Sequence, residues 1–142
     1  MRSLMIWRWL AGVTAIVSLG LPLSSHAQVW QVRAMLDKVS SPYIQLRDKD
    51  VAIEKVSRAW VQRFADVSDR LAPVYGLPVP SLYVEKLDGP NASVSPGQNG
   101  IVMRMSTDML KLVGDDDDLM ASVVGHELGH VKAESYIKVM TD

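Results

Sequence analysis

Apolar residues recur at intervals of three and four along residues 51–75, and this spacing predicts an amphipathic helix. Asp50 precedes the stretch as a candidate N-cap, and the prolines within residues 73–80 end it because proline cannot continue a helix. The preceding residues 33–48 indicate helix and turn. The apolar positions of the predicted helix are Val56, Trp60, Phe64, Val67, Leu71 and Val74.

Short strands and turns follow this helix. Strands are predicted over residues 81–87, 92–95 and 101–105, where apolar side chains alternate with small or polar ones. Clusters of turn-forming residues separate them at 88–91 and 96–100. We therefore expect a small antiparallel sheet.

Two further helices complete the α+β pattern. Ser106 is a candidate N-cap for a short helix that runs to Val113 and ends at Gly114. A longer helix is predicted over residues 119–140, after the acidic run 115–118. Carboxylates at a helix N-terminus oppose the positive end of its dipole, so the acidic run is interpreted as the start of this helix.

The first 27 residues have the pattern of a secretory signal peptide. Arg2 and Arg8 form a basic start, residues 9–21 an apolar run, and a small-x-small cleavage site ends at Ala27. The alternative is an uncleaved anchor, but the apolar run is shorter than the roughly 20 residues of a spanning helix. Cleavage after Ala27 is expected.

Composition narrows the class of protein. The chain has no cysteine, so neither a disulfide nor a lipid-modified cysteine is available, and an exported protein of this kind suits a bacterial periplasm. Without Arg2 and Arg8, the chain has 13 basic and 16 acidic residues. The resulting net charge of −3 does not favour nucleic acid as a partner. The mature length is enough for one small domain.

The last predicted helix carries His126, Glu127 and His130, an H-E-x-x-H pattern. Helical residues four apart share a face, so the two imidazoles can converge on one metal ion, for which zinc is the usual candidate. Glu127 lies about 100° around the helix from His126, where it can take a proton from the water that attacks a peptide carbonyl. About two chance matches are expected per thousand chains of this composition, so coincidence is a poor explanation.

Two glycines accompany the histidines. Gly125 and Gly129 lie four apart in the helix interior, where glycine is unfavourable by about 1 kcal/mol relative to alanine. We infer that another backbone approaches this stripe closely. The alternative is that both glycines are merely tolerated.

Residues 77–131 resemble the catalytic domain of the HtpX and CAAX prenyl protease family of zinc metallopeptidases, which are gluzincins, and especially its small periplasmic members. The resemblance rests on Asn91-Ala92, Pro96-Gly97, the strand at 101–105, the acidic run and the zinc-binding pattern, in this order and spacing. It implies a zincin-like fold, with the small sheet packed on the active-site helix. A signal peptide (1–27) and an N-terminal segment (28–50) would precede a partial catalytic domain (51–142).

The resemblance also implies roles for individual residues. His126 and His130 would be ligands of one Zn²⁺ ion, and Glu127 the catalytic acid and base. An extended protein or peptide substrate would add as a further strand at the edge of the cleft, where family members usually have an aromatic residue and an alanine in place of this chain's serine and valine. The residues implied at this edge are Ala92, Ser93, Val94 and Ser95.

A third zinc ligand is implied on a later helix, and it is a glutamate. This chain has no glutamate after Glu134, which would lie about 12 Å along the helix from His126 and so cannot readily share the ion. We therefore expect either a fragment of a longer protease, with the ligand beyond Asp142, or a natural truncation with weak zinc affinity.

Three functions follow as hypotheses. The first is a zinc metalloendopeptidase that acts on misfolded or unassembled envelope proteins, with contact to the membrane periphery left open. The second is a truncated, non-catalytic relative that acts through weak metal binding or protein contacts. The third is an exported helical domain whose histidines are incidental.

Overall fold

The computed structural model describes residues 28–141, and their side chains as far as Glu134. The described residues form a mixed α+β fold, as expected, whereas the predicted signal peptide lies outside them. No helix within this part of the chain has both the length and the apolar character needed to cross a membrane. The elements are β2 (Gln28–Gln31), α1 (Val32–Lys38), β3 (Tyr43–Asp48), β4 (Val51–Ser57), α2 (Arg58–Leu71), the 3₁₀-helix η3 (Ala72–Tyr75), β5 (Ser81–Lys86), β6 (Ala92–Gly97), β7 (Gly100–Ser106), α3 (Thr107–Val113) and α4 (Asp117–Thr141).

The main sheet has four strands in the order β2-β5-β7-β6. The β2 and β5 strands pair antiparallel, as do β6 and β7, but β5 and β7 pair parallel. The prediction of an antiparallel sheet was therefore wrong for the central pair. Residues 87–91 carry the chain from β5 to the far edge, and β7 then returns between β5 and β6, which makes the two inner strands parallel.

A two-stranded sheet precedes α2, where the sequence pattern predicted the start of a helix. Residues 51–57 are strand β4, which pairs antiparallel with β3, and the helix α2 begins only at Arg58. Its N-cap is Ser57, so the prediction of Asp50 as the cap was wrong. Asp50 lies beside Lys49, which has a positive φ of 57° in the turn between the two strands.

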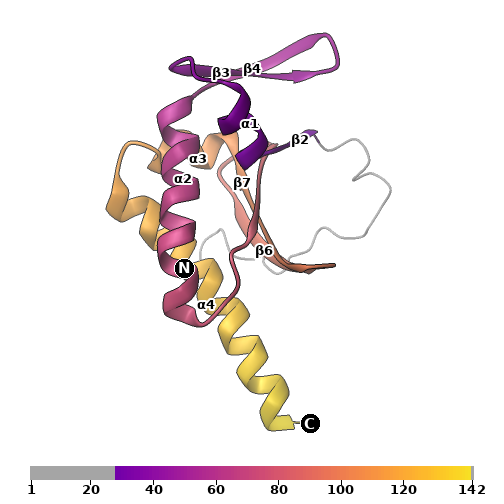
Figure 1. Cartoon of the computed structure of the whole chain (residues 1–142), viewed down its shortest axis with the longest axis vertical. Coiled ribbons are helices and arrows are strands. Elements are labelled where there is room, and N and C mark those ends of the chain that lie inside the picture. Colours follow the sequence, from indigo (N-terminus) through magenta and orange to yellow (C-terminus); the bar gives the residue numbers. More distant parts are fainter. Residues whose placement is uncertain (1–27, 142) are drawn as a thin grey trace.

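The hydrophobic core lies between the sheet and the helices. In Figure 1, α2 and α4 lie together on one side of the strands β6 and β7, and the β3–β4 hairpin lies at the far end from the C-terminus. Because side chains alternate along a strand, one face of β5 and β7 supplies the core. The largest fully buried side chains include Phe64, Val67, Leu82, Met103, Met105, Leu110, Met120 and Leu128.

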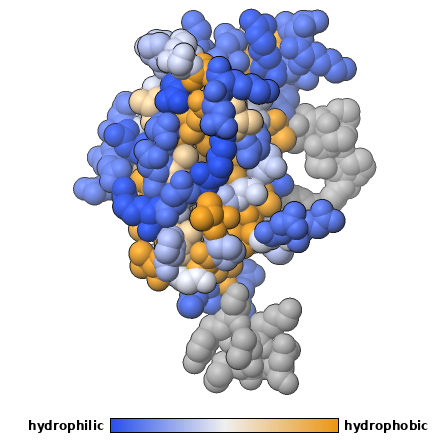
Figure 2. Space-filling view, in the orientation of Figure 1, coloured by the Kyte–Doolittle hydropathy of each residue, from blue (hydrophilic) through white to orange (hydrophobic). Residues whose placement is uncertain are grey.

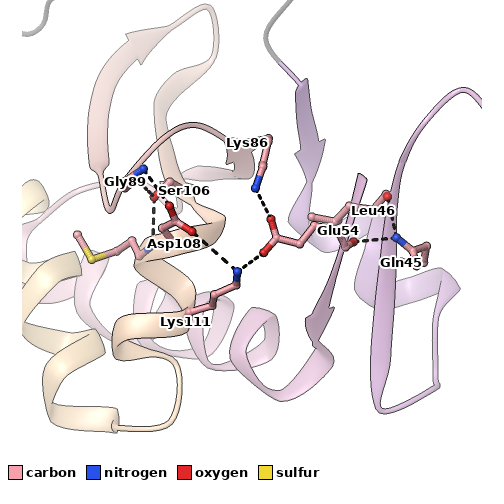
Figure 3. Close-up of polar contacts among 9 residues, drawn as sticks. Gln45, Leu46, Glu54, Lys86, Gly89, Ser106, Asp108 and Lys111 are labelled. Carbon is pink, nitrogen blue, oxygen red and sulfur yellow. Dashed lines mark hydrogen bonds and ion pairs between the residues drawn. The ribbon is translucent and has the colours of Figure 1, made fainter. Parts of the chain in front are cut away.

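The β3–β4 hairpin is attached to the rest of the fold partly by ion pairs. Figure 2 shows that the molecular surface around the hairpin is largely hydrophilic. Glu54 of β4 lies between two lysines, with Lys86 Nζ 2.7 Å from its Oε1 atom and Lys111 Nζ 2.6 Å from its Oε2 atom (Figure 3). These contacts join the hairpin to the end of β5 and to α3.

We expect the Glu54 ion pairs to make stability depend on acid pH. Burial alone would raise the pKa of Glu54, but hydrogen bonds from Lys111 and Lys86 outweigh it and lower the pKa to about 2. The ionised carboxylate therefore stabilises the fold above its ordinary pKa of 4.5, and this contribution is lost as the pH falls from about 4.5 to 2. Allowing for solvent screening of the lysines, it amounts to about 1–2 kcal/mol.

Urea denaturation at pH 7 and at about pH 2.5 measures this contribution, because the lower pH is close to the lowered pKa of Glu54. Glu54→Gln is expected to lower the free energy of unfolding at pH 7 and to reduce its fall toward acid pH. Glu134→Gln makes the same chemical change at an exposed position of α4 and is the matched control. Equal pH dependence of Glu54→Gln and the unsubstituted chain would contradict the expectation.

Candidate metal centre

The helix α4 begins with a side-chain cap supplied by the acidic run. Asp116 Oδ1 accepts hydrogen bonds from the backbone N–H groups of Asp118 at 2.9 Å and Leu119 at 3.1 Å. Asp117 forms ion pairs with Arg63 and Arg70 of α2. The interpretation of this run as a helix start is confirmed, and the run also fixes α4 against α2.

The two histidines predicted as ligands lie together on the exposed side of α4. His126 Nε2 and His130 Nε2 are 3.0 Å apart, and the ring centroids are separated by 4.5 Å. Two imidazoles bound to one tetrahedral zinc ion would place these nitrogens about 3.3 Å apart. The arrangement therefore fits a shared metal ion with little adjustment of the side chains.

Glu127 completes the group from the buried side of the helix. The candidate ligand atoms of His126, Glu127 and His130 all lie within 4.8 Å of one another. The Glu127 side chain is buried, and burial raises its pKa to about 8. Among the groups that the structure describes, which include side chains only as far as Glu134, its Oε2 atom has no hydrogen-bond partner, an arrangement that is unfavourable for stability. A cation at the imidazoles would favour the ionised carboxylate.

The glycine stripe of α4 faces a side chain and not another backbone, so that prediction was wrong. A Cβ atom added to Gly125 would lie 3.2 Å from the Tyr75 hydroxyl, and one added to Gly129 would lie 3.8 Å from Tyr75 Cε2. The phenol ring of Tyr75, in η3, therefore packs along α4 at the two glycines that directly precede His126 and His130. Because η3 follows α2 directly, this contact also connects the end of α2 to α4.

Alanine substitutions at the two glycines are expected to differ. Gly129→Ala should raise the free energy of unfolding by about 0.5–1 kcal/mol, because alanine favours the helix and the new methyl group meets only an ordinary contact. Gly125→Ala should raise the free energy of unfolding by less than Gly129→Ala does, or should lower it, because its methyl group crowds the Tyr75 hydroxyl.

Urea denaturation of both variants measures this difference. Tyr75→Phe removes the crowding oxygen, so Gly125→Ala should be more favourable in that background than in the original chain. Equal effects of the two alanines, unchanged by Tyr75→Phe, would contradict the packing described.

The four residues implied as substrate contacts share one strand. This strand, β6, contacts α4 and lies at one edge of the main sheet. Its alternate side chains point toward the core, opposite Met105 and Met103 of β7, and the serines between them point to the other face of the sheet. The residues concerned are Ala92, Ser93, Val94 and Ser95.

The hydrogen-bond pattern shows which backbone groups of β6 face outward. Asn91, just before the strand, accepts a hydrogen bond from the Ser106 backbone N–H at 2.9 Å, so its backbone points toward β7. Antiparallel pairing alternates along a strand, and the backbone groups of Ala92 and Val94 therefore point away from β7. Within residues 28–141, no further strand pairs with this edge.

Pro96 limits the length of the edge of β6 that faces away from β7, here called the open edge. It occupies the next outward-facing position after Val94, and proline has no N–H to donate. The open edge therefore offers N–H donors at two positions of β6, Ala92 and Val94. The alternation of strand positions was visible in the sequence, but the outward direction of these groups depends on which strand neighbours β6.

Comparison with known proteins agrees with this site. The model of the family described as Peptidase family M48 matches residues 57–141, which is more than half of the chain and extends from the N-cap of α2 to the end of α4. No curated protein and no solved structure matches the chain. Peptidases of this family depend on zinc, and the His126, Glu127 and His130 group provides suitable ligand types. The chain therefore belongs to the M48 family of metallopeptidases.

Proposed function

We propose that the protein is a zinc-dependent metalloendopeptidase that resembles the small periplasmic members of the HtpX and CAAX prenyl protease family. The observation that carries the proposal is the pair of imidazole nitrogens 3.0 Å apart, beside the buried carboxyl group of Glu127. The edge strand β6 packs against the same helix and supports the binding of an extended substrate. The zincin-like packing of sheet and active-site helix is part of this proposal.

In this mechanism, His126 and His130 would hold the metal ion, and Glu127 transfers protons. Zinc bound there would supply a positive centre that acidifies water and polarises the scissile carbonyl. Glu127 accepts a proton from the attacking water and donates it to the leaving amine nitrogen. The outward-facing backbone groups of Ala92 and Val94 hold the substrate main chain in extended form.

A third protein ligand forms part of the proposal. Glu134 is exposed and lies eight residues after His126 on α4. Among the residues whose side chains are described, it does not join the metal-binding group. We therefore propose that a further ligand, outside this group, completes the coordination of the ion.

The cellular setting is inferred from the sequence alone. The basic and apolar pattern of residues 1–27 and the lack of cysteine support export to a bacterial periplasm. Misfolded or unassembled envelope proteins would then be the substrates, because an open strand edge binds main chain in an extended, unfolded segment. Association with the membrane periphery is compatible with this setting.

Removal of the metal tests the proposed function. A zinc-replete mature chain, prepared with any residues downstream of Asp142, is expected to hydrolyse casein. Hydrolysis should stop after treatment with a chelator and return when zinc is added. Hydrolysis that survives complete removal of metal would exclude the metallopeptidase. A folded, zinc-loaded protein without activity would favour the non-catalytic relative.

A further inference from the structure

The loop between β5 and β6 is held to the fold at three places, and the first two of them are drawn in Figure 3. At its start, the Lys86 side chain contacts Glu54 Oε1 at 2.7 Å. In its middle, the Gly89 N–H donates a hydrogen bond to Asp108 Oδ2 at 2.9 Å. At its end, the Asn91 N–H donates to Ser106 Oγ, also at 2.9 Å. The loop is therefore tied to the fold at Gly89 and Asn91, and by Lys86 directly before it.

Ser106 makes more of these contacts than an N-cap requires. Its hydroxyl accepts hydrogen bonds from the N–H groups of Met109 at 3.1 Å and Asn91, and donates to the Gly89 carbonyl at 3.0 Å. A serine hydroxyl has one donor and two acceptor sites, so all of its capacity is used. Ser106 is fully buried, and water cannot replace these bonds if they are removed.

Asp108 holds the same loop from the first turn of α3. Its Oδ2 atom binds the Gly89 N–H, while its Oδ1 atom lies 3.9 Å from Lys111 Nζ. Lys111 in turn pairs with Glu54. The loop is thus attached to α3 and, through Lys111, to the β3–β4 hairpin.

The end of this loop is next to the open edge of β6. Asn91 directly precedes Ala92, whose backbone is the first to face outward. Any movement of residues 89–91 would therefore shift the first backbone groups available to an added strand. An edge that is fixed before binding loses less conformational entropy when a peptide adds to it.

We propose that Ser106 and Asp108 are positioning residues for substrate binding, because they fix the loop from Gly89 to Asn91 and so set the edge strand β6 in the place where a peptide adds. The inference rests on the proposed function, in which β6 binds extended substrate. Neither residue is required to touch the peptide. Their effect should appear in peptide affinity and not in the binding of metal.

Peptide affinity can be measured without turnover by using the Glu127→Gln chain as the reference. The probe is a fluorescein-labelled casein peptide of about ten residues, long enough to cover the edge of β6, and its Kd is obtained from fluorescence anisotropy. Asp108→Ala is expected to raise the Kd about fivefold, which corresponds to one hydrogen bond. Asp108→Asn retains an acceptor for the Gly89 N–H and should remain within about twofold of the reference.

A second ligand separates positioning from general loss of structure. Acetohydroxamate binds the metal and is too small to cover β6, so its affinity and the zinc content should be equal in all variants. Ser106→Ala should weaken peptide binding by tenfold or more if it folds, because three hydrogen bonds are lost. If Ser106→Ala does not fold, the comparison of Asp108→Ala with Asp108→Asn still tests the proposal.

Equal peptide affinities of Asp108→Ala and Asp108→Asn would overturn the proposal, as would a reference chain that binds no peptide. Hydrolysis is measured separately on chains that retain Glu127. Normal hydrolysis together with equal affinities would contradict this inference alone. If peptide binding depends on Asp108 but the zinc-replete chain with Glu127 shows no hydrolysis, the result would instead contradict the proposed function.

Discussion

Replacement of Glu127 by glutamine is expected to reduce casein hydrolysis by about a thousandfold or more while the zinc content of the protein stays unchanged. Glutamine has nearly the same shape as glutamate but cannot accept a proton, and acid–base catalysis contributes typically 10²–10⁴-fold to a rate. Glu127 is buried beside the imidazole pair, so a substitution of equal size should leave their arrangement intact.

Glu134→Gln is the matched control for this experiment. It makes the same chemical change on the same helix, but at an exposed position outside the metal-binding group described for residues 28–134. Its rate of hydrolysis should equal that of the unsubstituted protein. Comparable rates for Glu127→Gln and Glu134→Gln, in protein with full zinc content, would rule out the role assigned to Glu127.

Replacement of His126 by alanine is expected to weaken zinc binding by at least about a hundredfold and to remove hydrolysis with it. Loss of a residue that only supports a ligand costs about 10–100-fold in metal affinity, and loss of the ligand itself should cost more. The His126 side chain is exposed, so the metal-free variant should unfold at nearly the same urea concentration as the metal-free parent.

Zinc competition with a fluorescent chelator measures this affinity directly. Lys132→Ala removes another exposed side chain of α4 and should leave the zinc affinity unchanged. His130→Ala should behave as His126→Ala does, because both nitrogens face the same point. An undiminished zinc affinity in either histidine variant would show that the ion binds elsewhere.

The elements near the site follow local rules and were predictable from sequence. The strands β5, β6 and β7 cover the segments where alternation predicted them, but the turn expected at 96–100 is confined to residues 98–99, because β6 extends to Gly97 and β7 begins at Gly100. Ser106 caps α3, as its position before the helix indicated. The convergence of His126 and His130 follows from helical spacing alone. The candidate metal-binding pair is thus a local feature of α4.

The features that depend on contacts distant in sequence were not predictable in the same way. Residues 51–57 have apolar positions that fit a helix, but pairing with β3 makes them a strand. Residues 43–48 were expected to form helix and turn, but they are strand β3, in which the buried residues Ile44 and Leu46 alternate with exposed ones. The parallel pairing of β5 with β7 depends on the path of residues 87–91, which no periodicity reveals.

The surroundings of the site also depend on contacts between segments distant in sequence. The contact of Tyr75 with the glycine stripe and the burial of Glu127 both depend on how α2, η3 and the sheet pack on α4. The extra hydrogen bonds of Ser106 depend on where the β5–β6 loop passes. The sequence identifies the candidate ligands and the candidate proton carrier, whereas the fold determines how these groups are held.

Zinc X-ray absorption spectroscopy of the purified mature protein, including any residues downstream of Asp142, tests directly whether His126 and His130 bind one metal ion. We expect one zinc ion per chain with scattering from two imidazole rings at about 2.0–2.1 Å, and loss of that signal in the double variant His126→Ala/His130→Ala. A zinc site without imidazole scattering, or a signal that survives in the double variant, would contradict this expectation.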